Sequence, residues 1–433
     1  MIDRSETTVV VAAEQNISTT RSNKRALLAL GLGNTMEQYD WIIFGLLASF
    51  IGPQFFPSHD PLAATMNALI IFAVGFAMRP VGGVILGFVA DRFGRRRVLL
   101  WSFTLMALMT LVIGITPSYA AIGPWASIIL CACRVIQGIS AGVEIPLVTS
   151  YAVELTPKGN EGRTGGYMSF YVNLGILLAS LVSFFNSLFL SEEVMNSWGW
   201  RIPFLVGALL GAVVIFLRRS LPESLVEADR QTTPQIWSGV RRAWMGVLAI
   251  VFVVGAVQAY IYAWNVGLPN LARGTYRENP TMVFAVTTVL SVLLLVASPI
   301  CGKLADRFKL SRVFIWTRLL AIPSVFLMLL YTAQGMGTFI AVVFGGAVML
   351  ALNSTIYNVV ATSLLPKACR GTGVALGYGI GVALFGGTAS YLLLWLRDNN
   401  MIWMFPVYIS VLSLISVLLY IIVRRKGGIY AGE

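Results

Sequence analysis

Five ionisable side chains lie inside long apolar stretches of the sequence. They are Glu37, Asp40, Arg79, Arg134 and Glu144. Placing one such residue at the centre of a bilayer costs about 2.5–3.5 kcal/mol, so each needs a partner or a function. A carboxylate can bind and release a proton, and an arginine can bind an anion or hold a carboxylate in its charged form. These residue types predict a site that handles protons and an anionic molecule.

The spacing of these residues predicts that they meet. Glu37 and Asp40 are three residues apart and share one face of a helix. At a rise of ~1.5 Å per residue, Asp40 lies roughly 21 Å along the first apolar stretch, and Arg134 roughly 14 Å along the fourth, which runs the opposite way. Both depths fall near the middle of a core ~30 Å thick. We expect a carboxylate–arginine cluster there. Arg79 lies at a similar depth, and either pairing with Glu37 or binding an anionic ligand is open to it.

The elements that must position these residues are apolar helices. Of 433 residues, 57% are apolar and 12% are charged, about half the charged fraction of a soluble domain. The apolar residues form long blocks, which predicts an all-α integral membrane protein with twelve transmembrane helices. The predicted spans are 26–51, 62–90, 98–116, 125–152, 164–190, 201–217, 244–270, 281–305, 313–332, 338–363, 372–396 and 402–423.

A repeated charged turn indicates two related halves. The pattern of residues 87–98 recurs at 302–313, about half the chain later, with Gly, Ala, Asp, Arg and Phe at the same offsets. The sequence therefore predicts two pseudo-symmetric six-helix bundles. The expected parts are a cytoplasmic tail (1–25), an N-terminal bundle (26–217), a cytoplasmic linker (218–243), a C-terminal bundle (244–423) and a second tail (424–433).

The distribution of charge predicts the orientation in the membrane. With the N-terminus inside, cytoplasmic segments hold 23 of the Lys and Arg residues and the outer loops hold four. The positive-inside rule then places both termini in the cytoplasm. The net charge of +12 comes from these short turns, which is not the pattern of a nucleic-acid-binding protein. We expect an integral protein of a bacterial inner membrane that acts as a monomer in the lipid bilayer.

Other chemistry finds little support. The four cysteines and the single histidine, His59, do not form a metal-binding pattern, so we expect no metal and no cofactor. The sequence contains no phosphate-binding loop, which excludes an ATP-driven pump and leaves a gradient as the energy source. Nothing in the sequence indicates enzymatic catalysis.

The repeated turn resembles the signature of the major facilitator superfamily. The first copy fits it at Gly87, Asp91, Arg92, Gly94 and Arg95, whereas the second copy, with Asp306 and Arg307, has Lys309 where that family has glycine. In the superfamily these turns latch the cytoplasmic ends of the helices. The resemblance therefore implies that the residues of both copies are gating residues.

A narrower resemblance is to the metabolite–proton symporter family. It rests on four segments in order: Gly33–Asp40, Phe76–Gly83, the fourth-span residues Arg134, Gln137, Gly138, Gly142 and Glu144, and Trp198–Phe204. Members of that family carry citrate and other di- or tricarboxylates, 2-oxoglutarate, shikimate, or proline and betaine, together with protons. The resemblance implies a proton-coupled symporter that imports a small organic acid by alternating access. The intramembrane arginines favour a di- or tricarboxylate such as citrate.

A coupling hypothesis follows. When an anionic substrate takes Arg134, the neighbouring carboxylate loses its partner and binds a proton. Asp40 is the favoured proton carrier, with Glu37 and Glu144 as further candidates. The candidate substrate-binding residues are Arg134, Arg79, Asn34, Gln137, Tyr171, Asn265 and Tyr357. Arg318 begins the ninth span and is expected to reach the inner surface.

Three alternatives remain open from the sequence. Asp40 and Arg134 could form a permanent ion pair that only locks two helices together. The protein could export a metallophore-like carboxylate or a drug by proton antiport, with the same fold. A zwitterion such as proline or betaine could be the substrate instead of an anion.

Overall fold

The regular structure of the described chain is entirely helical. The computed structural model describes residues 28, 31–93, 95–142, 144, 161–218, 233–330, 335–366 and 369–426. A first helix covers 31–46. The helices that follow are α2 (Ala48–Phe55), α3 (Pro61–Ala77), α4 (Arg79–Phe93), α5 (Arg95–Ile115), α6 (Tyr119–Ile122), α7 (Trp125–Ala141), α9 (Glu161–Phe189), α10 (Glu192–Ser197), η1 (Gly199–Arg201), α11 (Ile202–Arg218), α12 (Thr233–Arg242), α13 (Trp244–Tyr262), η3 (Ala263–Gly267), α14 (Leu268–Asn270), η4 (Leu271–Thr275), α15 (Pro280–Ala305), α16 (Leu310–Phe326), η5 (Leu327–Leu330), α17 (Met336–Ser363), α18 (Arg370–Gly381), η7 (Val382–Gly386), α19 (Gly387–Asp398) and α20 (Met404–Lys426).

The lengths of these helices match a bilayer. Among the described residues, 10 helices are long and apolar enough to cross a membrane. The first and fourth predicted spans are also helical, over 31–46 with α2 and over α7, which is apolar but shorter. Part of the predicted 125–152 span lies outside the described residues. The second part of the predicted linker, 218–243, forms helix α12.

Several membrane helices are interrupted at their centres. The second span turns at Met78 between α3 and α4, directly before Arg79 and Pro80. Proline lacks a backbone N–H and cannot continue an α-helical ladder, which accounts for this break. Two further spans contain wide π-helical turns: η3 and η4 around α14, and η7 between α18 and α19. Single π turns inside helices are frequent at functional sites.

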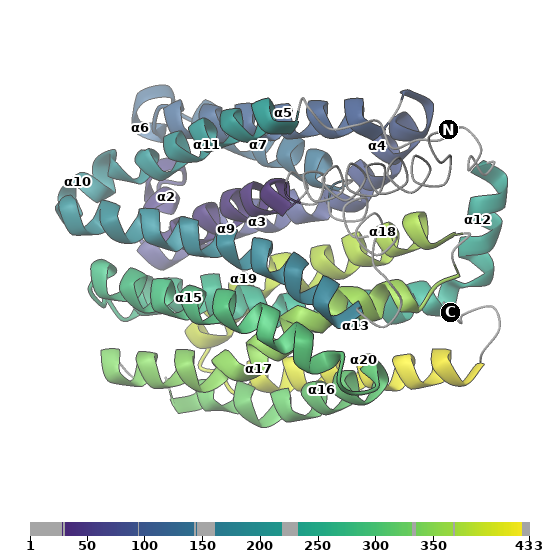
Figure 1. The fold of residues 1–433 in the computed structure, drawn as a ribbon. Helices are drawn as coiled ribbons and strands as arrows, with labels where there is room; N and C mark the ends of the chain where they lie inside the picture. Colours follow the sequence, from purple (N-terminus) through teal and green to yellow (C-terminus); the bar gives the residue numbers. More distant parts are fainter. Residues whose placement is uncertain are drawn as a thin grey trace, which may run out of the picture.

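The two halves of the chain form two groups of helices. In Figure 1 the helices of the first half lie above those of the second half, with α9 and α15 beside each other where the groups meet. Close approach there depends on glycine. A Cβ atom added to Gly302 on α15 would lie 2.5 Å from the carbonyl oxygen of Gly162 on α9. Similarly, one added to Gly379 on α18 would lie 3.3 Å from Pro80 on α4.

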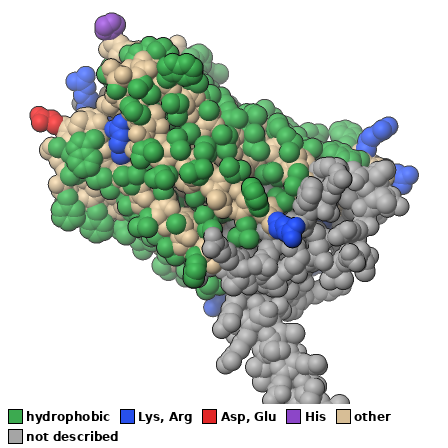
Figure 2. Space-filling view, turned by 90° about the horizontal axis from the view of Figure 1, so that it is seen from above, with side chains coloured by type: hydrophobic (Ala, Val, Ile, Leu, Met, Phe, Trp, Pro, Cys, Tyr) green, Lys and Arg blue, Asp and Glu red, His purple; other side chains and the backbone are tan. Residues whose placement is uncertain are grey.

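The outer surface is hydrophobic. Figure 2 shows apolar side chains spread over one face of the molecule, with charged groups mostly toward its ends. Large aromatic side chains are among the most exposed, including Trp101 at 73%, Phe189 at 77% and Phe216 at 72%. An apolar surface of this extent on an all-helical protein is the surface that lipid tails cover. The expected all-α membrane fold is confirmed.

Candidate functional site

The first helix carries two buried acids on one face. Glu37 is 1% exposed and Asp40 is 3% exposed. Helix α9 packs closely on this helix, since a Cβ atom on Gly175 would lie 2.2 Å from the carbonyl oxygen of Thr35. The absence of a side chain at Gly175 therefore lets the backbones of the two helices meet.

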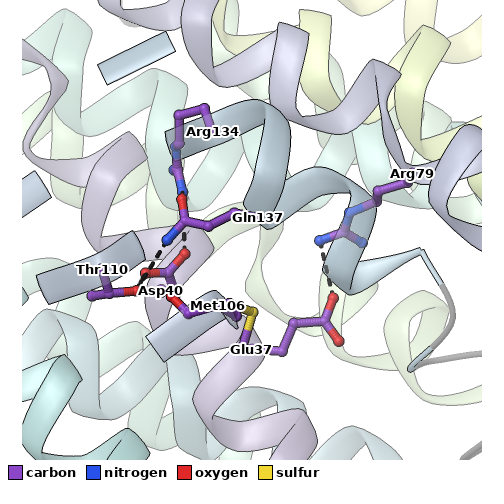
Figure 3. A network of polar contacts seen from close by, with 7 residues as sticks. All are labelled: Glu37, Asp40, Arg79, Met106, Thr110, Arg134 and Gln137. Atoms are coloured by element: carbon purple, nitrogen blue, oxygen red, sulfur yellow. Dashed lines mark hydrogen bonds and ion pairs between the residues drawn. The ribbon is translucent and has the colours of Figure 1, made fainter. Parts of the chain in front are cut away.

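Asp40 lies in a network confined to the first half (Figure 3). Its Oδ2 is 3.1 Å from Nη1 of Arg134, and its Oδ1 is hydrogen-bonded to the hydroxyl of Thr110 on α5. The same Nη1 of Arg134 donates to Oε1 of Gln137 at 2.7 Å. Nε2 of Gln137 in turn donates to the Thr110 hydroxyl at 3.0 Å. Two helices, α5 and α7, thus hold one carboxylate of the first helix, and the predicted meeting of the first and fourth spans is what the structure shows.

Aromatic rings cover Arg134. Its guanidinium carbon lies 3.9 Å from the ring centre of Phe44 and 4.8 Å from that of Trp41. Arg134 is 0% exposed, and its Nε and Nη2 have no hydrogen-bond partner. Cation–π contact stabilises such a buried cation but does not replace every lost hydrogen bond. The arginine is thereby held by one carboxylate, one amide and a wall of rings.

Glu37 has a separate arginine. Nη2 of Arg79 lies 3.1 Å from Oε1 of Glu37, and both side chains are almost fully buried. The guanidinium carbon of Arg79 lies 4.4 Å from the Trp41 ring and 4.6 Å from the Phe76 ring. Of the two possibilities for Arg79, the pairing with Glu37 is present in this conformation. Figure 3 shows the two acid–arginine pairs beside each other along the same helix.

The other residues predicted for the substrate-binding and proton-coupling site lie at separate places in the structure. Gln137 joins the Asp40 network, whereas Asn34 lies one helical turn before Glu37 and is buried with its amide oxygen unpaired. Tyr171 lies elsewhere, because its ring packs where a Cβ of Gly31 would be and its hydroxyl contacts that of Tyr167 at 2.9 Å. Glu144 is buried at 1%.

Asn265 and Tyr357 line a small cavity between the halves. Its volume is about 10 Å³, and its wall also includes Ser169 and Asn173 of α9 and Ser354 of α17. A cavity of this size holds about one water molecule. The structure is therefore closed around this point, and a metabolite would need the halves to separate.

Sequence reasoning missed three polar members of the site, namely Thr110, Gln258 and Tyr378. Thr110 is one of several hydroxyl residues in an apolar span, and nothing in the sequence distinguishes it from Thr104 or Thr116. Gln258 belongs to a pattern that the sequence does contain. Gln258, Tyr262 and Asn265 follow the i, i+4, i+7 spacing of one helix face. Its Nε2 donates to the hydroxyl of Tyr378 at 2.9 Å.

The expectation for Arg318 was wrong. The residue is 2% exposed and donates from Nη2 to the backbone oxygen of Val253 on α13, so it does not reach the inner surface. The reason is the position of α16, which begins at Leu310 and places Arg318 two turns inside the bundle. Side-chain reach alone gave no indication of this, because the direction of a side chain depends on helix packing.

The second copy of the charged turn bridges the halves. Asp306 accepts hydrogen bonds from the backbone N–H groups of Gly162 at 2.6 Å and Arg163 at 3.0 Å, at the start of α9. A carboxylate at a helix N-terminus satisfies free N–H groups and complements the helix dipole. Lys309 has φ −62°, so this turn does not need the glycine of the superfamily signature. Arg307 is exposed.

Most side chains of the first copy of the charged turn, residues 87–98, lie outside the described residues. Gly94 lies outside the described residues, and so do the side chains of Asp91, Arg92 and Arg95 and the surroundings of Gly87. Only the backbone is visible there, with α4 ending at Phe93 and α5 beginning at Arg95.

A second bridge lies at the opposite end of the halves' interface. Asn270 donates from Nδ2 to the backbone oxygen of Gly45 at 2.7 Å, and its Oδ1 accepts from the N–H of Ser49 at 3.1 Å. Arg273 lies 3.2 Å from the ring centre of Phe50 and donates to Oδ1 of Asn196 at 3.0 Å. The helices of the two halves thus contact each other at both ends of the central site.

A helical membrane fold whose two halves enclose buried ion pairs defines a membrane transporter rather than an enzyme. Residues 30–387 match the family model described as Major Facilitator Superfamily, and the chain belongs to that superfamily. The predicted membership of the major facilitator superfamily and the transporter class are confirmed.

Curated relatives place the chain among metabolite–proton symporters of this superfamily. The citrate-proton symporter of Klebsiella pneumoniae is 31% identical over 377 residues, which cover 84% of this chain and 83% of that protein. The alpha-ketoglutarate permease of Escherichia coli (strain K12) is 29% identical over 430 residues, 98% of each chain. The proline/betaine transporter of Salmonella typhimurium is 30% identical over 421 residues, 91% of this chain and 82% of that protein.

Solved structures share the fold. The proton:xylose symporter XylE bound to 6-bromo-6-deoxy-D-glucose superposes with a TM-score of 0.74 at 17% identity, over 94% of this chain and 96% of that one. A crystal structure of the D-xylose-proton symporter gives a TM-score of 0.71 at 18% identity, over 92% and 96% of the two chains. At these identities the likeness concerns the fold alone.

Proposed function

We propose that the protein is a proton-coupled symporter that imports a small organic acid, with a di- or tricarboxylate such as citrate as the leading candidate. The observation that carries the proposal is the ion pair between Asp40 and Arg134, both almost fully buried in an apolar bundle. The relatives support it, since one is named as a citrate-proton symporter and another as an alpha-ketoglutarate permease.

The pair supplies a reason for coupling. A buried ion pair is stable only while both charges are present, and removing one leaves a buried charge at a cost of about 3–5 kcal/mol. Asp40 therefore takes up a proton readily only when another anion compensates Arg134. Since binding free energies are reciprocal, a proton on Asp40 then favours the anion and the anion favours the proton.

Alternating access supplies the transport step. In this proposal the halves rock about the central site, with the Asp306 bridge holding one end closed and the Asn270 bridge holding the other. The Asp306 end is cytoplasmic, as the positive-inside count expects, and so are both termini. The monomer carries out the cycle in a bacterial inner membrane.

Uptake into proteoliposomes tests the function. The full chain is reconstituted, and citrate, 2-oxoglutarate, shikimate, proline and betaine are offered under an imposed inward proton gradient. We expect accumulation of a carboxylate that stops when a protonophore collapses the gradient. Accumulation that ignores the gradient, or movement of none of the five compounds, would refute the symport proposal. Proton-driven efflux instead of uptake would establish the antiport alternative.

A further inference from the structure

The two acid–arginine pairs have different surroundings. The hydrogen-bond and ion-pair partners given above for Asp40 and Arg134 come from helices of the first half, and aromatic rings cover Arg134. The pair of Glu37 and Arg79 instead faces the second half. Helix α18 crosses directly over it, because Gly379 approaches Pro80, the residue next to Arg79. A substrate that binds between the halves meets Arg79 before it meets Arg134.

Three polar side chains of the second half face this pair. Tyr357 of α17 and Tyr378 of α18 both interact electrostatically with Arg79 and with Glu37. Gln258 of α13 donates from Nε2 to the hydroxyl of Tyr378 at 2.9 Å and to that of Tyr357 at 3.4 Å. All three are at most 5% exposed. An amide and two phenols from three helices thus form a buried polar cluster within electrostatic range of Arg79.

The two phenols of this cluster carry the hydrogen-bond donors that a ligand would meet. Each phenol has one proton and accepts a hydrogen bond from Gln258 through its oxygen. The two phenols also interact with each other, which uses one of their two protons. Tyr357 also has a side-chain hydrogen bond with Asn358, so its phenol can exchange that amide for a ligand when the halves separate. A carboxylate held by Arg79 is an acceptor of the required kind.

A second positive charge, on Arg318, lies within electrostatic range of Tyr357. Arg318 is buried, interacts electrostatically with Tyr357, and has an Nε without a hydrogen-bond partner. Within the described ranges, none of the three ion pairs includes Arg318. Its charge is therefore not offset by a neighbouring carboxylate in that part of the chain. An isolated buried cation is costly, so a second negative charge on a ligand would stabilise it.

Tyr357 also connects the ion pair to the cavity. It lines the space of about 10 Å³ between α9 and the second half, together with Asn265, whose amide oxygen has no hydrogen-bond partner. The cavity and the Glu37–Arg79 pair thus belong to one polar zone between the halves. In the closed conformation this zone is contracted to about the volume of a water molecule.

We propose that one carboxylate of a dicarboxylate binds Arg79 in place of Glu37, that Gln258, Tyr357 and Tyr378 complete this subsite, and that the ligand's second charge is directed toward Arg318. The inference rests on the proposed symport function, and it gives Arg79 the first contact with substrate, before an anion reaches Arg134. When the carboxylate displaces Glu37, Glu37 takes a proton from the water on the open side. The groups that face it are Asp40 on its own helix, Arg79, and the phenols of Tyr262, Tyr357 and Tyr378.

Charge balance explains why proton and substrate bind together. Arg79 and Arg318 contribute two positive charges, a dicarboxylate contributes two negative charges, and protonated Glu37 contributes none. The loaded zone is then neutral, which lowers the cost of closing it inside an apolar bundle. A zwitterion carries no net charge and would leave this zone with two excess positive charges, so the balance selects a dianion.

Binding and transport by matched variants test the inference. The full chain in detergent is titrated with 2-oxoglutarate at pH 6 and pH 8, and uptake is measured in proteoliposomes. We expect Tyr378→Phe and Gln258→Leu to raise Kd and KM about ten-fold or more, because each loses a hydrogen bond to a charged group or its support. Glu37→Gln should bind at pH 8 as tightly as the wild type binds at pH 6, with its pH dependence lost.

Tyr260→Phe is the matched control. This buried tyrosine lies on the same helix as Gln258, but its hydroxyl donates to the backbone oxygen of Gly346 within the second half. Its Kd should stay at the wild-type value. If Tyr378→Phe and Gln258→Leu behave like this control while the wild type accumulates 2-oxoglutarate, the subsite is wrong and symport stands. If the wild type binds 2-oxoglutarate with the predicted variant effects but shows no proton-driven uptake, the subsite stands and symport is wrong. Tyr357→Phe supplies a second conservative variant should Gln258→Leu fail to fold.

Discussion

Glu37 and Asp40 lie one turn apart on the first helix, yet they bind different arginines. Asp40 pairs with Arg134 inside the first half, whereas Glu37 pairs with Arg79 where the halves meet. Both guanidinium groups lie over the ring of Trp41. One aromatic side chain thus contacts both pairs, and a change at either pair can be transmitted through direct packing rather than over a distance.

The first prediction concerns Asp40. Asp40→Asn keeps the shape of the side chain but removes the charge that compensates Arg134. We expect loss of gradient-driven accumulation, while exchange of labelled for unlabelled substrate remains measurable. Counterflow in proteoliposomes without a gradient measures the exchange. A variant that fails to fold would identify the pair as a structural lock between helices.

The second prediction concerns the hydroxyl of Thr110. It is hydrogen-bonded to Asp40 and accepts from Gln137, so Thr110→Val leaves buried polar groups unsatisfied. The cost of one such group is about 1–3 kcal/mol, which should appear as a lower melting temperature of the purified protein.

Thr104→Val is the control for this change. The hydroxyl of Thr104 is exposed on the same helix and donates only to the backbone oxygen of Leu100 at 2.7 Å. Its replacement should leave the melting temperature nearly unchanged. Equal effects of the two substitutions would show that the Asp40 network contributes nothing specific.

The third prediction concerns the bridge at Asp306. Asp306→Ala removes the acceptor for two N–H groups at the start of α9, a cap whose loss costs about 0.5–2 kcal/mol. We expect the halves to separate more often at that end. Alkylation of a cysteine placed at Ser298, a buried position at the α9–α15 contact, should become faster in a background without other cysteines.

Asp60→Ala serves as the matched substitution. Asp60 caps α3 within one half, where it accepts from the N–H of Leu62 at 2.9 Å. It should not change the alkylation rate at position 298. Faster alkylation with both variants would mean general destabilisation, and no change with either would remove Asp306 from the gate.

The fourth prediction concerns Asn270 at the other end. Asn270→Ala breaks the hydrogen bonds to Gly45 and Ser49 that join the halves, so we expect more frequent opening there. A membrane-impermeant thiol reagent should reach a cysteine at Ser49 faster in this variant. Asn399→Ala is the control, because that side chain is exposed and bonds only to Trp395 in its own helix. Equal reactivity in both variants would contradict the bridge at Asn270.

Much of the fold could be predicted from local features of the chain. Apolar blocks of bilayer length specify membrane helices wherever they occur, and the repeat of Asp91 at Asp306 indicates two halves. The meeting of Asp40 and Arg134 followed from helix rise alone, since depth in a membrane is set by residue number. The surroundings of Arg318 did not, because depth gives no information on which way a helix is turned.

The sequence by itself determined that this protein is a helical membrane transporter with acids and arginines at its centre, because composition, length and spacing are properties of the linear chain. Only the tertiary structure decided which arginine each acid binds. That choice depends on the rotation and crossing of helices, which contacts such as Gly82 against Ile139 and Gly379 against Pro80 set through close packing. The same packing brings Gln258, Tyr357 and Tyr378 from three separate helices to one point, and no pattern along the chain records that convergence.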